Sequence, residues 1–310
     1  MAVKNNFKFS VVVPVLNEEG NIKKLTKEIK ASMKKLGGFE LIYVNDGSTD
    51  GTADVLQKSN GVKVITFRKN FGQSAALDAG IKEAKGKYIV TLDGDGQNDP
   101  ADIPKLFEKL TEGYDVVCGW RHKRKDDRLK IFVSLGARKL RSVLVDDGVH
   151  DAGCTLRVYK KECFADLDLI GEMHRMIPAI LRWRGFRITE MKVNHRARTW
   201  GKTKYTMTRT VKGFLDMLLI WFTRKYNNRP LHLFGSVGLF LISFSVILLG
   251  VLAGMKLFYG YELSDKIWPL VGMMAFLAGL QLLVSGILAD MIIKNDTKNK
   301  SWMIKEIEEK

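Results

Sequence analysis

The stretch Lys87-Tyr-Ile-Val-Thr-Leu-Asp-Gly-Asp-Gly-Gln97 decides the fold, because it describes a buried strand that ends in two carboxylates. Residues 88–92 form a short apolar run rich in β-branched side chains, which is typical of a parallel strand covered on both faces. Asp93 and Asp95 follow at its carboxyl end, where ligands bind in open α/β sheets. Two carboxylates one residue apart can hold a divalent cation together with substrate phosphates. An acidic turn that caps the next helix is the structural alternative, because Asp-Gly pairs commonly form turns.

Strands and helices alternate on both sides of this run. The patterns predict further strands over residues 9–15, 39–44 and 62–67, and helices over residues 21–36, 52–59, 74–84 and 103–111. Such alternation predicts a mainly parallel sheet with right-handed crossovers. We expect the strand ends at Asn17, Asp46, Arg68 and Asp93 to line one edge of it. Polar residues at the ends of separate strands are what a nucleotide site in a doubly wound sheet requires.

Two long runs without a charged residue, 233–255 and 267–289, occupy the C-terminal part of the chain. Each is 23 residues long, enough to cross a hydrocarbon core of roughly 30 Å as a helix. A buried core helix is the alternative. The flanking basic residues are Arg224, Lys225, Arg229, Lys294, Lys298 and Lys300, whereas the connecting residues 256–266 are charge-balanced. The positive-inside rule therefore predicts a two-pass protein of the cytoplasmic (inner) membrane, with both termini in the cytoplasm.

The net charge of +16 is concentrated in two regions, residues 121–141 and 182–209. No nucleic-acid-binding motif accompanies them, so nucleic acid is not an expected partner, and anionic headgroups of the lipid bilayer are the simpler one. Residues 129–145 and 207–222 read as basic helices with an apolar side. Such helices are candidates for the membrane surface, and packing on the domain is the alternative.

A series of motifs follows in a fixed order along nearly the whole chain. They are Val-Val-Pro-Val-Leu-Asn-Glu-Glu from Val12, Val-Asn-Asp-Gly-Ser from Val44, Arg-Lys-Asn-Phe-Gly-Gln from Arg68, Leu-Asp-Gly-Asp-Gly-Gln-Asn-Asp-Pro from Leu92, Asp151-Ala-Gly-Cys-Thr-Leu-Arg157, Glu172-Met-His-Arg-Met-Ile-Pro178 and His195-Arg-Ala-Arg-Thr-Trp-Gly-Lys-Thr-Lys-Tyr205. With them the chain resembles family-2 glycosyltransferases of the polyprenyl-phosphate type, such as dolichol-phosphate mannosyltransferases and undecaprenyl-phosphate glucosyltransferases. Two positions depart from the pattern: the family usually has an acidic residue at Asn45 and a serine at Thr203.

The resemblance implies an α/β fold of the glycosyltransferase A type, with amphipathic interface helices and two C-terminal transmembrane helices. It implies a cytoplasmic catalytic domain over residues 1–229, in which residues from about 121 to 229 bind the acceptor and the membrane. A transmembrane hairpin over 230–294 and a cytoplasmic tail over 295–310 follow. The implied reaction moves a sugar from a UDP- or GDP-linked donor to polyprenyl phosphate. Inversion at the anomeric carbon is expected.

The resemblance also suggests roles for single residues. The nucleotide-sugar donor is assigned to Pro14, Asn17, Glu18, Asp46, Asn70, Asp93 and Asp95. Mg²⁺ or Mn²⁺ is assigned to Asp93, Asp95 and Gln97. The acceptor phosphate is assigned to Arg121, Arg138, Arg198 and Lys204, and catalysis to Asp95, Asp151 and Arg121.

Each assignment has a structural alternative. Pro14 and Asn17 can simply end a strand, and each of the four cations can be an ordinary surface charge. Asp151 can orient the acceptor or a catalytic arginine, act as a nominal base, or form a salt bridge with Arg157. His174 and His195 can touch phosphate or serve the fold alone.

Other functions also remain open. A processive polysaccharide synthase usually needs more membrane helices than two. A membrane-anchored nucleotide-sugar-binding protein without turnover, a phosphate-binding adaptor, and a glycosyltransferase with a different lipid or glycan acceptor are further alternatives. Gly235, Gly238, Gly250 and Gly254 offer small-residue faces for a homo-oligomer or for packing within the hairpin.

Overall fold

The computed structural model describes residues 7–121, 148–169, 171, 173–197, 200, 218, 221–222, 225–226, 229–263 and 266–295. The chain divides into two compact units, Met1–Leu218 and Leu219–Lys310. The predicted basic helix over residues 129–145 lies outside the described residues, as does most of the one predicted over residues 207–222.

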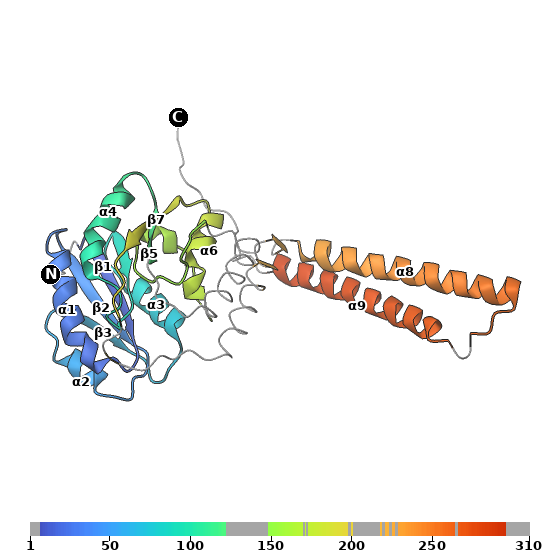
Figure 1. Cartoon of the computed structure of the whole chain (residues 1–310), viewed down its shortest axis with the longest axis horizontal. Coiled ribbons are helices and arrows are strands. Elements are labelled where there is room, and N and C mark those ends of the chain that lie inside the picture. Colours follow the sequence, from blue (N-terminus) through green and yellow to red (C-terminus); the bar gives the residue numbers. More distant parts are fainter. Residues whose placement is uncertain are drawn as a thin grey trace. The chain divides into compact units, whose positions relative to one another are not determined.

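The first unit is built on a sheet that, in the described residues, has seven strands in the order β3-β2-β1-β4-β6-β5-β7 (Figure 1). The strands are β1 (Phe9–Val15), β2 (Phe39–Asn45), β3 (Lys63–Thr66), β4 (Tyr88–Thr91), β5 (Val116–Arg121), β6 (Arg157–Lys160) and β7 (Ile188–Val193). Neighbouring strands are parallel except for β6, which is antiparallel to both β4 and β5. The predicted α/β fold with a mainly parallel sheet is confirmed.

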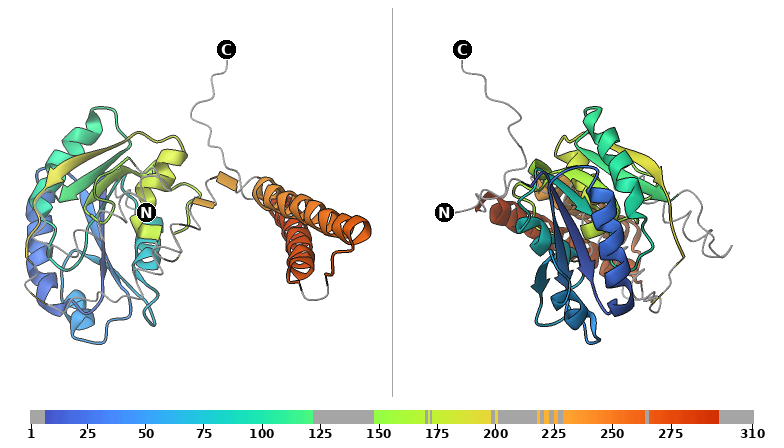
Figure 2. Two further views of the ribbon diagram at one scale, coloured as in Figure 1. Left: turned by 45° about the vertical axis from the view of Figure 1, so that its right-hand side comes forward. Right: turned by 90° about the vertical axis from the view of Figure 1, so that its left-hand side faces the viewer.

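The helices connect these strands. They are α1 (Glu19–Met33), α2 (Thr52–Gln57), α3 (Gln73–Lys82), α4 (Ile103–Thr111) and α6 (Ile177–Trp183), with 3₁₀ turns η1 (Pro100–Asp102), η2 (Lys161–Phe164) and η3 (Met173–Arg175). The four predicted helices are all present, with ends that differ by at most three residues. Figures 1 and 2 show α1 and α4 on one side of the sheet and α3 and α6 on the other.

Successive side chains of a strand point to opposite faces of the sheet, and each face has its own hydrophobic core. Val11 and Val13 of β1 pack with Ile22 of α1 in one core. Val12, between them in sequence, packs with Leu77 of α3 in the other. Both sets are fully or almost fully buried. A strand covered on both faces reads as an unbroken apolar run, which explains why the sequence shows no polar alternation here.

The parallel order β3-β2-β1-β4 brings the carboxyl ends of four strands to one edge, as the sequence predicted. The turn after β4 lies close against β1 at Gly94. A Cβ atom at Gly94 would lie 2.5 Å from Val15 Cγ1 and 3.0 Å from the Pro14 carbonyl oxygen. Only glycine fits this approach, which fixes the position of Asp93 and Asp95 beside β1.

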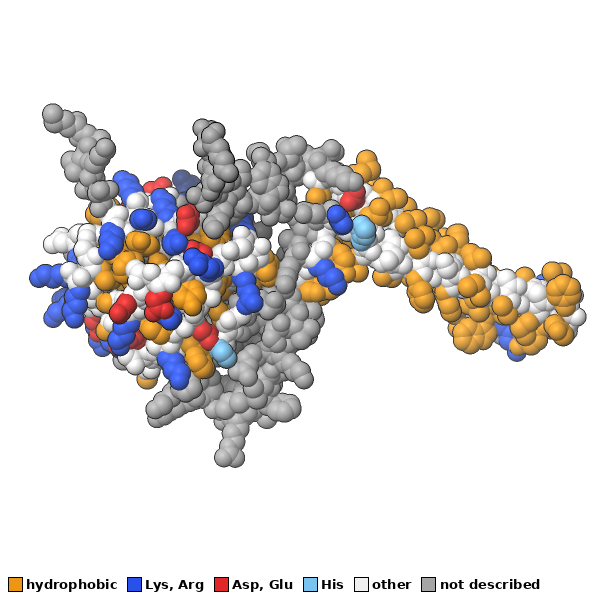
Figure 3. Space-filling model, turned by 90° about the horizontal axis from the view of Figure 1, so that it is seen from above, with side chains coloured by type: hydrophobic (Ala, Val, Ile, Leu, Met, Phe, Trp, Pro, Cys, Tyr) orange, Lys and Arg blue, Asp and Glu red, His pale blue; other side chains and the backbone are white. Residues whose placement is uncertain are grey.

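The second unit contains α8 (Pro230–Tyr259) and α9 (Trp268–Asn295). Both are long and apolar enough to cross a membrane, with mean hydropathies of 2.5 and 2.0 over their most apolar windows. Only 17% of each window is buried, whereas the core helix of a soluble protein would be mostly covered. Figure 3 shows hydrophobic side chains along the length of this helix pair. The predicted hairpin of two apolar helices is therefore present.

The two helices approach most closely where glycines face each other. A Cβ atom at Gly238 would lie 2.7 Å from the Gly279 carbonyl oxygen, and one at Gly279 would lie 2.7 Å from the Gly238 carbonyl oxygen. Gly250 and Gly254 have no other atom within 4 Å of such a position. Of the predicted small-residue faces, the one containing Gly238 serves packing within the hairpin.

This difference predicts unequal effects for one substitution at two glycines. Gly238→Val should push α8 away from α9 and destabilise the hairpin by about 1–3 kcal/mol. Gly250→Val adds the same side chain at an open position and should leave the hairpin intact. Thermal unfolding of both purified variants in detergent measures the difference, and equal losses of stability would contradict the observed helix contact.

Candidate active site

The loops after β1 and β2 hold each other in place. Asn17 lies two residues after the end of β1 and has a left-handed backbone, at φ 56°. Its side-chain oxygen accepts a hydrogen bond from the Thr49 N–H at 2.8 Å, and its own N–H donates to Ser48 Oγ at 3.0 Å. The Glu18 N–H donates to Thr52 Oγ1 at 2.9 Å. Asn17 therefore has a structural role in the turn after β1, whereas Pro14 lies within the strand, and a contact of either residue with the donor stays a prediction.

Asp46, at the end of β2, is buried and fixes the loop before α3. One carboxylate oxygen accepts the Phe71 N–H at 2.7 Å and the other accepts the Gly72 N–H at 3.0 Å. The same loop passes so close to Gly47 that a Cβ there would lie 2.6 Å from the Asn70 nitrogen. Asn70 itself is exposed. Asp46 thus places Asn70 at the site edge, and direct contact of either residue with nucleotide stays a prediction.

The carboxylates after β4 are the chemical centre of this edge. Asp93 accepts a hydrogen bond at 2.7 Å from Gln73 Nε2, at the start of α3. Asp95 is only 8% exposed, and its Oδ1 accepts the Gln97 N–H at 3.0 Å, which closes the turn. Pro14 contributes the backbone against which this turn packs. The strand end, the helix start and the glycine turn thus converge on two neighbouring carboxylates.

Electrostatics at this pair disfavours two negative charges. Burial raises the pKa of Asp93 to about 6, and the neighbouring Asp95 carboxylate adds to the rise. A hydrogen bond from Thr155, the charge of Arg121 and the hydrogen bond from Gln73 oppose it without cancelling it. The pair would accordingly be stabilised by a bound cation.

The residues present fit a hard divalent cation. Asp93 and Asp95 supply carboxylate oxygens, which Mg²⁺ and Mn²⁺ prefer. The described residues contain no group of three or more His, Cys, Asp or Glu side chains placed to hold a metal ion. A cation here would therefore rely on phosphate and water for its other ligands. The Gln97 amide donates to the Arg196 carbonyl oxygen at 3.4 Å, so its predicted role as a further ligand stays a prediction.

Arg121 and Asp151 form a two-point ion pair at the same edge. Arg121 Nε lies 2.6 Å from Asp151 Oδ2, and Nη2 lies 2.8 Å from Oδ1. Their side chains are 13% and 11% exposed. Among the described residues, Arg121 Nη1 has no hydrogen-bond partner. Asp151 therefore orients the guanidinium of Arg121 through Nε and Nη2.

The suggested salt bridge between Asp151 and Arg157 is wrong. Arg157 is fully buried and donates instead to the carbonyl oxygens of Ala152 and His174. The reason is strand geometry: Arg157 begins β6 and is directed into the interior, whereas Asp151 lies in the segment before it and meets β5.

The two histidines differ in their surroundings. His174 is buried, and its Nδ1 lies 2.9 Å from Ser74 Oγ, which supports a role in the fold. His195 is exposed and pairs with Asn98 in an isolated bridge that brings the start of the 195–205 motif beside the carboxylate turn. Arg138, Arg198 and Lys204 lie outside the described residues.

Sequence reasoning missed the contacts that three residues make at this site. Gln73 and Thr155 hold Asp93, and Arg157 holds the segment that contains Asp151. All three lie inside motifs that were recognised, and that membership was the available signal. Their roles depend on contacts between distant segments, which the motifs do not contain.

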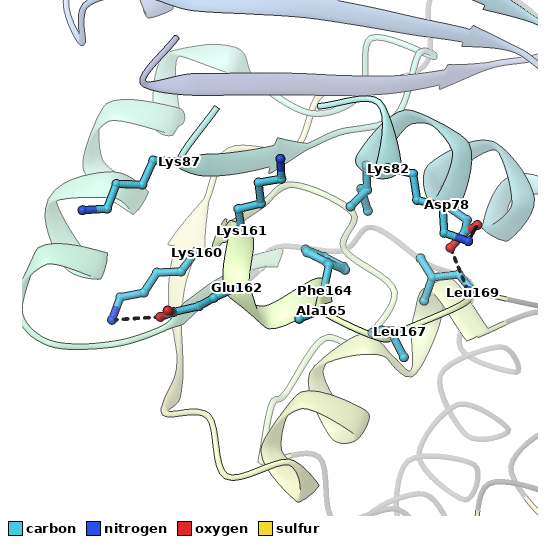
Figure 4. A pocket seen from close by; sticks show the side chains of 11 residues that line it. Asp78, Lys82, Lys87, Lys160, Lys161, Glu162, Phe164, Ala165, Leu167 and Leu169 are labelled. Atoms are coloured by element: carbon cyan, nitrogen blue, oxygen red, sulfur yellow. Dashed lines mark hydrogen bonds and ion pairs between the residues drawn. The ribbon is translucent and has the colours of Figure 1, made fainter. Parts of the chain in front are cut away.

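A pocket of about 520 Å³ lies elsewhere, at the opposite edge of the sheet near Lys87 at the start of β4 (Figure 4). Its rim carries lysines, but Lys82 is paired with Asp78 at 2.7 Å and Lys160 with Asp115 at 2.6 Å. The strand direction separates it from Asp93 and Asp95, so it is not part of the candidate active site.

Comparison with known proteins agrees with this arrangement. Residues 10–168 match Glycosyl transferase family 2. The chain is 36% identical to the dodecaprenyl-phosphate galacturonate synthase of Rhizobium johnstonii, over 97% of this chain and 93% of that protein. It is 32% identical to the undecaprenyl-phosphate 4-deoxy-4-formamido-L-arabinose transferase of Aeromonas hydrophila, over 91% of this chain and 87% of that one.

Solved structures agree on the fold. Glucosyl-3-phosphoglycerate synthase from Mycobacterium tuberculosis, crystallised with Mn²⁺, UDP and phosphoglyceric acid, superposes with a TM-score of 0.56 at 21% identity. The match covers 72% of this chain and 80% of that one. The protein described here belongs to glycosyltransferase family 2, and it is an enzyme of that family.

The raised pKa of Asp93 predicts that ionisation of this side chain destabilises the metal-free fold. The folded-state pKa of about 6 exceeds the ordinary value of 3.8. The contribution of protonated Asp93 to the free energy of unfolding is therefore fully present below about pH 4, and it is lost as pH rises through about 6. At pH 7.5 the metal-free Asp93→Asn variant should therefore unfold at a higher temperature than the wild type. The difference should disappear near pH 4. Thermal unfolding in chelator across this pH range measures it.

The exposed Asp168 provides the control, since its only ion pair among the described residues is with Lys82. Asp168→Asn should show no such gain at pH 7.5. Mn²⁺ should raise the unfolding temperature of the wild type and not that of Asp93→Asn. A destabilised Asp93→Asn variant at pH 7.5 would show that the charge of Asp93 is already compensated.

Proposed function

We propose that this enzyme transfers a sugar from a nucleotide diphosphate sugar, UDP- or GDP-linked, to polyprenyl phosphate at the cytoplasmic face of the membrane. The observation that carries the proposal is the meeting of an acidic pair, Asp93 and Asp95, with the oriented cation Arg121. Relatives over nearly the full chain length are named for prenyl-phosphate products or acceptors. The apolar hairpin α8–α9 suits an enzyme with a lipid-linked substrate.

The proposed reaction forms one bond and breaks another at the anomeric carbon. An oxygen of the acceptor phosphate attacks that carbon, and the bond to the nucleotide diphosphate breaks, with its electron pair leaving on the diphosphate. Attack opposite the leaving group inverts the configuration. The nucleophile is already anionic at neutral pH, so the chain must position two anions rather than remove a proton.

Each side of the site serves one anion. Mg²⁺ or Mn²⁺ on Asp93 and Asp95 would neutralise charge on the donor diphosphate and its leaving group. Structures of the same fold hold Mn²⁺ or Mg²⁺ with UDP, which supports this choice of cation. Arg121 presents its open side to the acceptor phosphate, because an arginine can bind phosphate through two nitrogens. Arg138, Arg198 and Lys204 are proposed to complete that cationic surface.

The remaining parts of the chain follow from the same proposal. Asn17, Glu18, Asp46 and Asn70 lie in loops around the proposed donor site. Residues 1–229 would form the cytoplasmic catalytic domain, with residues from about 121 onward at the membrane surface. Residues 230–294 would form the transmembrane hairpin, and both termini would be cytoplasmic because the flanking lysines and arginines lie outside the hairpin loop.

Transfer of radiolabel to undecaprenyl phosphate tests the reaction. A panel of UDP- and GDP-sugars is incubated with the detergent-solubilised chain and Mg²⁺ or Mn²⁺. One donor should give chloroform-soluble label that is lost on chelation and reduced by at least about a hundredfold in Asp95→Ala. Asp168→Asn, at an exposed site, should transfer at the wild-type rate. Nucleotide binding without transfer from any donor would favour the binding-protein alternative.

The ion pair predicts how Asp151 acts. A carboxylate held by two guanidinium contacts is a poor proton acceptor, so Asp151→Asn should lose orientation of Arg121 and not a general base. We expect kcat to fall about ten- to a hundredfold while the shape of the pH–rate profile is retained. Steady-state transfer rates from pH 5.5 to 9 provide the measurement. Loss of the acidic limb of the profile would instead assign Asp151 the role of base.

A further inference from the structure

Arg157 is a buried cation without a carboxylate partner among the described residues. Its side chain is 1% exposed. Nη2 donates to the Ala152 carbonyl oxygen at 2.6 Å, and Nη1 donates to the His174 carbonyl oxygen at 3.1 Å and to Tyr159 Oη at 3.4 Å. Nε has no partner among the described residues. Burying a guanidinium without a carboxylate partner costs free energy of desolvation. Its contacts with two separate segments therefore indicate a role beyond filling the core.

The two carbonyls belong to different segments, one next to Asp151 and the other held by Ser74 of α3. Ala152 directly follows Asp151, and the Cys154 N–H donates to the Asp151 carbonyl oxygen at 3.3 Å, which closes the turn that contains both residues. Its carboxylate holds Arg121. One arm of the Arg157 guanidinium therefore ends one residue away from the proposed acceptor-binding ion pair.

The other arm reaches the donor side. His174 is held by Ser74, through Nδ1 to Oγ at 2.9 Å and through its N–H to Oγ at 3.0 Å. Ser74 directly follows Gln73 in α3, and Gln73 donates to Asp93. Hydrogen bonds thus link Arg157 to His174 and His174 to Ser74, the backbone of α3 joins Ser74 to Gln73, and Gln73 donates to Asp93.

The sheet places Arg157 between the two strands that carry these groups. In the strand register, Arg157 of β6 lies opposite Thr91 of β4 and opposite Cys118 of β5. Asp93 comes two residues after Thr91, and Arg121 three residues after Cys118. Arg157 is fixed in the sheet, so its two arms can fix the separation of the two flanking segments.

We propose that Arg157 is a positioning residue that sets the distance between the Asp151–Arg121 ion pair and the Asp93–Asp95 pair. It acts through the Ala152 and His174 carbonyls and does not touch substrate. This inference rests on the proposed function, since it is that reaction which requires the acceptor phosphate to meet the donor at a defined distance.

Arg184 provides a matched control. Its guanidinium also donates to two backbone carbonyls, those of Ala165 and Asp166, both at 2.8 Å. These contacts lie away from the carboxylate turn, beyond the C-terminal end of α6. The comparison therefore separates positioning of the site from general support of a loop by an arginine.

The test measures transfer by the full chain in detergent for Arg157→Met, Arg157→Lys and Arg184→Met. Arg157→Met should lower kcat about a hundredfold with donor KM within about threefold, because misplacement affects the reacting geometry more than binding. Arg157→Lys, which can still donate to both carbonyls, should recover about tenfold. Arg184→Met should keep the wild-type kcat. The double variant Arg157→Met with Asp151→Asn should be no slower than Arg157→Met alone, since both act through Arg121.

If folded Arg157→Met has the wild-type kcat and only its unfolding temperature is lower, the proposal is overturned. Arg157 would then be a structural residue. Hydrogen exchange provides a readout independent of activity. In Arg157→Met, peptides spanning residues 150–154 and 173–177 should both exchange at least about tenfold faster than in the wild type, whereas Arg184→Met should leave both unchanged. If the wild type transfers no sugar, the proposed function fails, and unchanged exchange in these two peptides would independently overturn the link made by Arg157.

Discussion

The repulsion between the Asp93 and Asp95 carboxylates is the interaction on which the rest of the site depends. Gly94 brings the two carboxylates together against β1, where Asp93 is half-buried and Asp95 is buried, so water screens their repulsion less than at an open surface. Three groups reduce the cost, namely Gln73 from α3, Thr155 before β6 and Arg121 from β5. Each of these three groups comes from a different element. The energetic cost of the two adjacent carboxylates is therefore reduced only when the sheet is assembled in the order β1-β4-β6-β5. The antiparallel strand β6 matters here, because it brings the Thr155 segment beside β4 and holds β5 close enough for Arg121 to act on Asp93.

A second constraint is that polar side chains hold the loops of this edge in place. Asn17 and Asp46 accept main-chain N–H groups of neighbouring loops, and Asp95 accepts one within its own turn. The residue types that suit nucleotide binding are therefore the same ones that give the loops their shape. A substitution at Asp46 would release the Phe71–Gly72 loop as well as any ligand contact. A loss of activity on substitution of Asp46 therefore has two causes, release of the loop and loss of a ligand contact, and a measurement of stability beside activity separates them.

The sequence was sufficient for the parts of the fold that depend on local pattern. Strand β1 and helix α4 occur at their predicted residues, and the two apolar helices follow from uncharged runs. The carboxylate turn followed from the Asp-Gly-Asp spacing after an apolar strand. Prediction failed where a contact joins residues that the pattern does not relate. Asp151 is close in sequence to Arg157, and this proximity suggested their ion pair. In the structure, the direction of β6 turns Arg157 inward. Arg121, 30 residues away in sequence, pairs with Asp151 instead. The short strand β6, with a charged residue at each end, likewise carries too little pattern to show that it would insert antiparallel between β4 and β5.

Under the proposed function, the arrangement of charge would let Asp151 lie next to the acceptor phosphate without acting as a base. An acceptor phosphate repels both the donor diphosphate and the carboxylate pair, so the electrostatic barrier to its approach is the main one to lower. A free carboxylate at residue 151 would add to that barrier. Paired with Arg121 at two points, it instead converts a flexible cation into a fixed one and keeps the net charge of the pair near zero. The acidic and the cationic side of the edge are then separated by the width of β6, whose first residue, Arg157, contacts the segments that carry both.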